Sequence, residues 1–80
     1  MDDSEVLHRI EALVAEEHRL RQSEEAGHAG PDQRARIQQI EVSLDRAWDL
    51  LRQRRAMRDR REDPNDAMER PASVVEGYEQ

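Results

Sequence analysis

Three histidines, His8, His18 and His28, are the side chains of this sequence that titrate near neutral pH. Two of them follow a glutamate by three residues, as Glu5–His8 and Glu25–His28. Helical bundles hold two-metal sites with this Glu-x-x-His spacing. One helix cannot bring both pairs to the same level, and only an antiparallel pair of molecules could do so. We therefore predict solvated histidines, with no metal and no cofactor.

One carboxylate, that of Glu17, interrupts an apolar helical stripe. Its candidate partners are Arg21 one turn later and Arg34 or Gln38 across a hairpin. An acid at a catalytic site would need a second catalytic group, whereas a seam residue only fixes the register of two helices. No such group accompanies Glu17, so we interpret it as structural. The sequence also lacks a Ser/His/Asp constellation, a phosphate loop and zinc spacing, and we predict that the protein is not an enzyme.

The strongest local signal is a basic run at residues 52–61, where six Arg and one Asp give a net charge of +5. Such a run can bind phosphates by releasing counterions. However, the whole chain has a net charge of −6, and Trp48 is the one aromatic side chain near the run. We therefore predict an interaction or structural module with a protein partner, and keep a nucleic-acid accessory role as the alternative. The candidate interaction residues are Trp48, Arg52, Arg54, Arg55, Arg58, Arg61 and Tyr78.

Two amphipathic helices must position these residues. Apolar side chains recur with helical spacing at Val6, Ile10, Leu13 and Leu20, and again at Ile37, Ile40, Leu44, Ala47 and Leu51. Between them, Gly27 suits the left-handed residue after a helix and Pro31 suits the first turn of the next helix. The pattern predicts helices over about 4–26 and 32–61 and a loop at 27–31. The expected fold is all-α, an antiparallel, coiled-coil-like two-helix hairpin.

Folding about this loop sets a register for the hairpin. The expected pairs are Leu20 with Ile37, Leu13 with Leu44, Ile10 with Ala47 and Val6 with Leu51. The same register places Asp2 and Asp3 near Arg54 and Arg55. Two helices alone leave part of the stripe open to water. We therefore predict a homodimer that forms a four-helix bundle, with Trp48 either at the interface or anchoring the core of one chain.

The chain divides into three segments of alternating charge. Residues 1–26 hold eight acidic residues and three Arg, net −5, and residues 32–61 hold five acidic residues and nine Arg, net +4. Residues 62–80 hold six acidic residues and one Arg, net −5, and include Pro64 and Pro71. This acidic tail is expected to form no long helix. It either docks on the hairpin or stays free.

The composition indicates in which compartment the protein acts. The sequence contains no Cys, which excludes disulfides and thiolate metal sites and fits a reducing compartment. Its start is acidic rather than signal-like, and no apolar run approaches the length of a membrane span. We therefore predict a cytoplasmic protein with no membrane association. The hydrophobic fraction of 35% is low, so partial disorder stays open.

Three stretches of the chain carry a family resemblance: HRIEALVAEEHRLR at 8–21, LDRAWDLLRQRRAMRD at 44–59, and EDPNDAMERPASVVEGYEQ at the end. They resemble a family of small bacterial proteins, domain-of-unknown-function family 2630, over nearly the whole chain. The resemblance implies the architecture and includes the tail in the folded unit, but it implies no activity. In that family a Cys often replaces Ala47 and the end is more apolar than Glu79-Gln80, which argues against an essential thiol.

Overall fold

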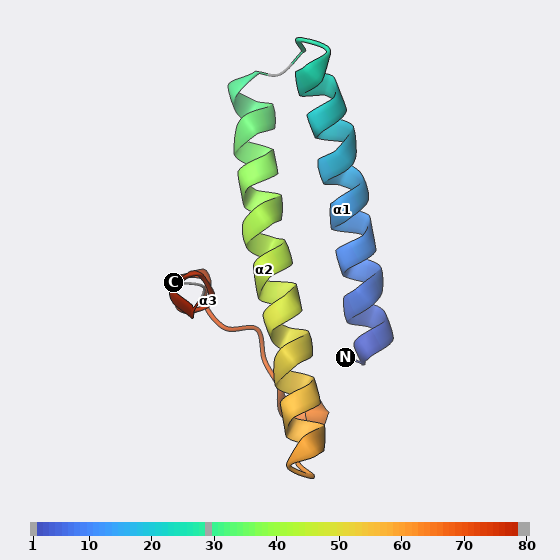
Figure 1. The fold of residues 1–80 in the computed structure, drawn as a ribbon, viewed down its shortest axis with the longest axis vertical. Helices are drawn as coiled ribbons and strands as arrows, with labels where there is room; N and C mark the ends of the chain where they lie inside the picture. Colours follow the sequence, from blue (N-terminus) through green and yellow to red (C-terminus); the bar gives the residue numbers. More distant parts are fainter. Residues whose placement is uncertain (1, 29, 79–80) are drawn as a thin grey trace.

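The computed structural model describes residues 2–28 and 30–78, and side chains within these ranges as far as Val75 (Figure 1). Regular structure in this part of the chain is entirely helical. The elements are α1 (Asp3–Glu25), α2 (Pro31–Asp59), the short 3-10 helix η1 (Pro64–Asp66) and α3 (Ala72–Tyr78). The long helices α1 and α2 pack against each other in opposite directions, which confirms the predicted all-α hairpin.

Local signals in the sequence set the start of α1 and the turn that follows it. Asp2 caps α1, because its carboxylate accepts a 2.9 Å hydrogen bond from the Glu5 N–H. At the other end, Gly27 adopts a φ of 80° and donates to the Glu24 carbonyl at 3.0 Å. The N–H of His28 donates to the Ser23 carbonyl at 2.9 Å. Both bonds together form a Schellman motif, which needs the left-handed residue that glycine supplies.

The core lies between α1 and α2, towards the open end of the hairpin. Val6 and Ile10 of α1 cluster with Ala47 and Leu50 of α2, and all four are buried. Partly buried side chains around this cluster are Leu44, Leu51 and Ala67. The cluster agrees with the expected register of Ile10 with Ala47 and Val6 with Leu51. Ala67 comes from the tail, so the tail adds a side chain to the core that the two predicted stripes form.

The tail starts beside α1 and ends on the far side of α2. Ala67 packs against the core between the two helices and Glu69 pairs with Arg9 of α1 at 2.7 Å, whereas α3 lies beyond α2. Figure 1 shows α2 in the middle, with α1 on one side and α3 on the other, and both η1 and α3 contact α2. Val75 of α3 is fully buried.

The molecule measures 50 × 26 × 15 Å, so its shortest dimension is little more than the thickness of one helix with its side chains. Glu69 of the tail pairs with Arg9 of α1 and with Arg46 of α2, so the tail crosses one broad face of the hairpin. Side chains of α2 remain exposed on the opposite face, as at Trp48.

Candidate functional site

Trp48 lies on the broad face of the hairpin that the tail leaves open. The residue before it, Ala47, packs against α1, and the residue after it, Asp49, binds the tail. Successive residues of a helix point about 100° apart, so Trp48 projects outward between the two contacts. Its side chain is 46 % exposed. The tryptophan therefore flanks the core of the single chain and does not fill it.

An apolar groove of about 530 Å³ surrounds Trp48. Its lining is Leu7, Ile10, Glu11, Val14, Ala15, His18 and Trp48. Leu7 and Val14 are, like Trp48, large apolar side chains left exposed. We refer to the surface around Leu7, Val14 and Trp48 as the Trp48 face. Grouped exposure of this kind is typical of a contact surface, whereas scattered apolar side chains need no explanation.

A basic hollow adjoins this groove at the open end of the hairpin. It has a volume of about 270 Å³, and its lining is Asp3, Leu7, Trp48, Leu51, Arg52, Arg55 and Arg58. Because both hollows share Leu7 and Trp48, they form one continuous surface with an apolar centre and a basic end. The structure thus brings four of the seven candidate interaction residues together, namely Trp48, Arg52, Arg55 and Arg58.

The other three candidate interaction residues do not line this surface: two lie elsewhere on the protein, and the side chain of the third lies outside the described residues. Arg54 is buried, with 6 % of its surface exposed. Arg61 follows α2 with a positive φ of 60° and is exposed. Tyr78 ends α3, and its side chain lies outside the described residues.

An ion-paired cluster closes the open end of the hairpin. Asp3 accepts hydrogen bonds from Arg54 Nε at 2.5 Å and from Arg58 Nη2 at 2.8 Å. Arg54 Nη1 also donates to the Pro64 carbonyl at 3.0 Å, which ties the tail to the hairpin. The expected meeting of Asp2 and Asp3 with Arg54 and Arg55 is therefore right for one pair. Residues 54 and 58 share a helix face, whereas residue 55 points about 100° away and residue 2 is the cap.

This cluster makes acid stability depend on Asp3. Hydrogen bonds from Arg58 and then Arg54 lower the pKa of Asp3 from 3.8 to about 2. A carboxylate with a depressed pKa stabilises the fold fully above its unfolded pKa and loses that contribution as pH falls towards the folded value. We therefore expect stability measured by urea unfolding to decline as the pH falls from about 4 to 2. An Asp3→Asn variant should decline less steeply, and equal slopes for both proteins would contradict this role.

Asp49 forms a second polar cluster, on the tail side of α2, which sequence reasoning missed. Its side chain is only 1 % exposed, yet it is fully bonded: Arg70 Nε donates to it at 2.9 Å and Gln53 Nε2 at 3.0 Å. Gln53 also donates to the Met68 carbonyl at 2.8 Å, and Arg46 Nε to the Arg70 carbonyl at 3.0 Å. The Arg70 hydrogen bond lowers the pKa of Asp49 despite burial, so the carboxylate stays charged.

The basic run is largely satisfied within the protein. Arg54 and Arg58 bind Asp3, and Arg60 binds Glu62 at 3.0 Å. Arg52 lies 3.9 Å from Asp49, at the limit of an ion pair. Neither Arg55 nor Arg61 makes an ion pair with any residue that the structure describes. A run of +5 in the sequence thus leaves few cations free on the surface.

The remaining candidates for chemistry do not converge. Glu17 lies 3.5 Å from Arg21, the first of its predicted partners, in an i,i+4 pair in which Glu17 is partly buried and Arg21 is exposed. His18 lines the apolar groove, while His8 and His28 are exposed at other levels of α1 and its turn. Within residues 2–28 and 30–78, no three His, Asp or Glu side chains are grouped so that they could hold a metal ion. Over the same residues, no helix is long and apolar enough to cross a bilayer.

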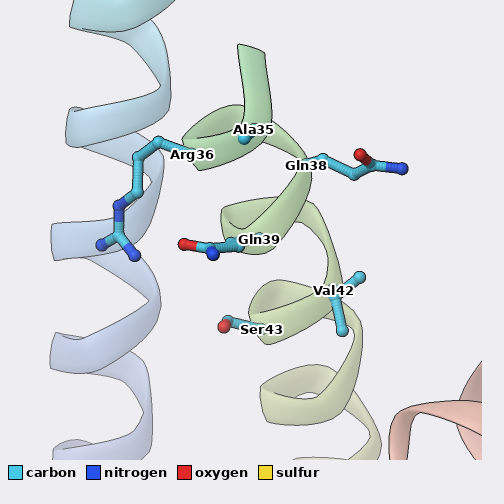
Figure 2. Close-up of a pocket in the computed structure, with 6 residues that line it drawn as sticks. All are labelled: Ala35, Arg36, Gln38, Gln39, Val42 and Ser43. Atoms are coloured by element: carbon cyan, nitrogen blue, oxygen red, sulfur yellow. The ribbon is translucent and has the colours of Figure 1, made fainter. Parts of the chain in front are cut away.

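A further hollow, of about 560 Å³, follows the first half of α2 (Figure 2). Its lining is Ala35, Arg36, Gln38, Gln39, Val42 and Ser43. All six come from one helix, and Figure 2 shows Arg36 reaching towards α1 while Gln38 and Val42 point the other way. Arg36 is held by Glu16 through bonds of 2.7 and 2.8 Å. This surface therefore offers no convergent group to act on a substrate.

Comparison with known proteins identifies relatives over nearly the full length. The family model "Protein of unknown function (DUF2630)" matches residues 2–80. Uncharacterised proteins of Mycobacterium tuberculosis and Mycobacterium bovis are each 49% identical over 77 residues, which cover 95% of this chain and 88% of theirs. No solved structure matches the chain. These matches confirm the resemblance that the sequence carries, tail included.

Proposed function

This chain belongs to the DUF2630 family of proteins of unknown function, and we propose that it is a non-catalytic protein-interaction module that binds through the Trp48 face. One observation carries the proposal: a tryptophan 46 % exposed beside two further exposed apolar side chains in a chain of 80 residues. Leaving such a group in water has a cost that a partner would remove. The Cys-free composition fits a reducing compartment, so the proposed place of action is the cytoplasm.

The composition of the face supports binding to protein. Tryptophan and arginine are the residues that most often dominate the energy of protein interfaces, especially at the centre of a patch. Here Trp48 is central, Leu7 and Val14 flank it, and Arg52 and Arg55 form the rim. An apolar centre with a charged rim is the usual anatomy of a specific interface.

A nucleic-acid accessory role is the second candidate, because Trp48 and Arg55 lie in one hollow and could stack on a base and contact a phosphate. It is the weaker candidate because much of the basic run is already ion-paired within the protein. Arg54, Arg58 and Arg60 are already bonded to carboxylates, which nucleic acid would have to displace. Salt separates the two candidates, since phosphate binding weakens steeply with salt and apolar docking does not.

Replacing Trp48 tests the proposal. We expect Trp48→Ser to weaken protein binding about tenfold or more, because it removes the central apolar contact. The fold should change little, since the side chain is half exposed in the free chain. Binding is measured by pull-down from a mycobacterial lysate, together with light scattering of the purified protein to detect self-association.

Met68→Ser provides the matched control, because Met68 is a large apolar side chain, 74 % exposed, on the tail side of α2. It should bind like the wild type. If Trp48→Ser retains the same bound proteins and the same molar mass as the wild type, the Trp48 face is not an interaction site.

A further inference from the structure

Charges on the Trp48 side of α2 follow an ordered pattern. Glu41, Asp45, Trp48, Arg52 and Arg55 are spaced by steps of four, three, four and three residues, so they form one stripe along the helix. Both acids lie on the loop side of Trp48, and both arginines lie towards the open end. On α1, Glu11, the acidic residue of the apolar groove, also lies on the loop side of Trp48. The stripe is therefore apolar in the middle, negative at one end and positive at the other.

This pattern is complementary to itself. A two-fold axis through Trp48 and perpendicular to α2 turns a second copy end for end, so each residue faces one equally far on the other side of Trp48. Arg55 of one copy then faces Glu41 of the other, seven positions from Trp48 in each case. Arg52 faces Asp45 within one position. Every attraction occurs twice, because an isologous interface repeats each contact.

The charges of the stripe are available for such contacts. Asp45 and Arg55 make no ion pair with any residue that the structure describes. Arg52 reaches its nearest carboxylate, that of Asp49, only at 3.9 Å. Glu41 is bonded to Arg21 at 2.5 Å but stays 51% exposed. A second arginine could therefore still approach Glu41.

We propose that the occupant of the Trp48 face is a second copy of this chain, bound antiparallel about a two-fold axis near Trp48. The inference rests on the proposed function, because it names the partner of the same face. Leu7, Val14 and Trp48 of each copy meet at the centre, and α1 and α2 of both copies form a four-helix bundle. A molecule 15 Å in its shortest dimension gains a second layer in this way.

Charge reversal tests the arrangement. Arg52→Glu with Arg55→Glu makes the stripe wholly acidic, and Glu41→Arg with Asp45→Arg makes it wholly basic. We expect the wild type to be a dimer by sedimentation velocity at micromolar concentrations. Each double variant alone should dimerise about tenfold more weakly or worse, because all four facing pairs become repulsive. An equimolar mixture should form a heterodimer, since all four pairs become attractive again.

A control separates this pattern from attraction by net charge. Arg19→Glu with Arg61→Glu carries the same charge change at exposed positions off the stripe. It should dimerise with itself like the wild type, and it should not draw the basic variant into heterodimers. Circular dichroism is used to check that each variant is still helical. Heterodimers as abundant in that control mixture as in the mixture of acidic and basic variants, or unchanged dimerisation of the stripe double variants alone, would overturn the antiparallel arrangement.

The mass of the wild type distinguishes failure of this inference from failure of the proposed function. A monomeric wild type would overturn the inference. If that monomer still captures a protein from lysate in a Trp48-dependent manner, the proposed function stands without it. A monomer that retains salt-released nucleic acid and captures no protein overturns both.

Discussion

An Asp49→Ala variant is expected to release the tail from α2 and to lower the free energy of unfolding by about 3 kcal/mol. The carboxylate is 1 % exposed and accepts from two side chains, Arg70 and Gln53. Hydrogen bonds between a carboxylate and a guanidinium are among the stronger ones in proteins, and those of a buried group are not screened by water. Removing Asp49 takes away the carboxylate that Arg70 binds on α2.

Limited proteolysis and thermal unfolding measure this effect separately. The variant should be cut within residues 62–71 under conditions in which the wild type is not, because loss of the Asp49 contacts lets this segment open more often. Asp49→Asn keeps the shape but not the charge, so it should fall between the two. Asp59→Ala is the control, as it removes an exposed aspartate from the same helix, and it should change stability by less than about 0.5 kcal/mol. A tail as resistant in Asp49→Ala as in the wild type would show that its other contacts, such as the Arg9–Glu69 pair and the bond from Arg54 to Pro64, hold it without Asp49.

The hairpin was predictable because its signals are local. Gly27 and Pro31 mark the turn through their own backbone preferences, and each stripe repeats within one helix. The pairing of Asp3 with the second helix also followed, since the turn fixes the register of everything beyond it. What failed there was the choice of partner, because one residue step along a helix turns a side chain by about 100°.

The tail could not be placed in the same way. Its pairing of Arg70 with Asp49 links two residues through a segment that has no periodicity, so no repeat in the sequence sets their distance. The available signal was a charged residue inside the apolar stretch Ala47–Leu51, which asks for a partner without naming it. The sequence also left Trp48 either at an interface or in the core of one chain, and the structure leaves its side chain 46 % exposed beside the core.

Arg54→Ala and Arg55→Ala are expected to act on different properties although the residues are adjacent. Arg54 is buried and joins three parts of the chain, through Asp3 of α1 and the carbonyl of Pro64 in η1. Its loss should lower the free energy of unfolding by about 2 kcal/mol, because several charge-assisted bonds and the packing of its stem disappear together. Arg55 is exposed and forms no ion pair among the described residues, so its loss should change stability by less than about 0.5 kcal/mol.

Binding should respond in the reverse order. Arg55 lines the basic end of the Trp48 face, so Arg55→Ala should weaken association while leaving the unfolding curve in place. Arg54→Ala should leave association intact at temperatures where the protein is folded, because Arg54 does not line that surface. Urea unfolding at low protein concentration and sedimentation velocity measure the two properties independently. Equal losses of stability in both variants would mean that the open end of the hairpin is held by general positive charge. A loss of stability in Arg54→Ala alone would instead show that one buried guanidinium stabilises the open end of the hairpin. Arg55 would then contribute to binding and not to stability.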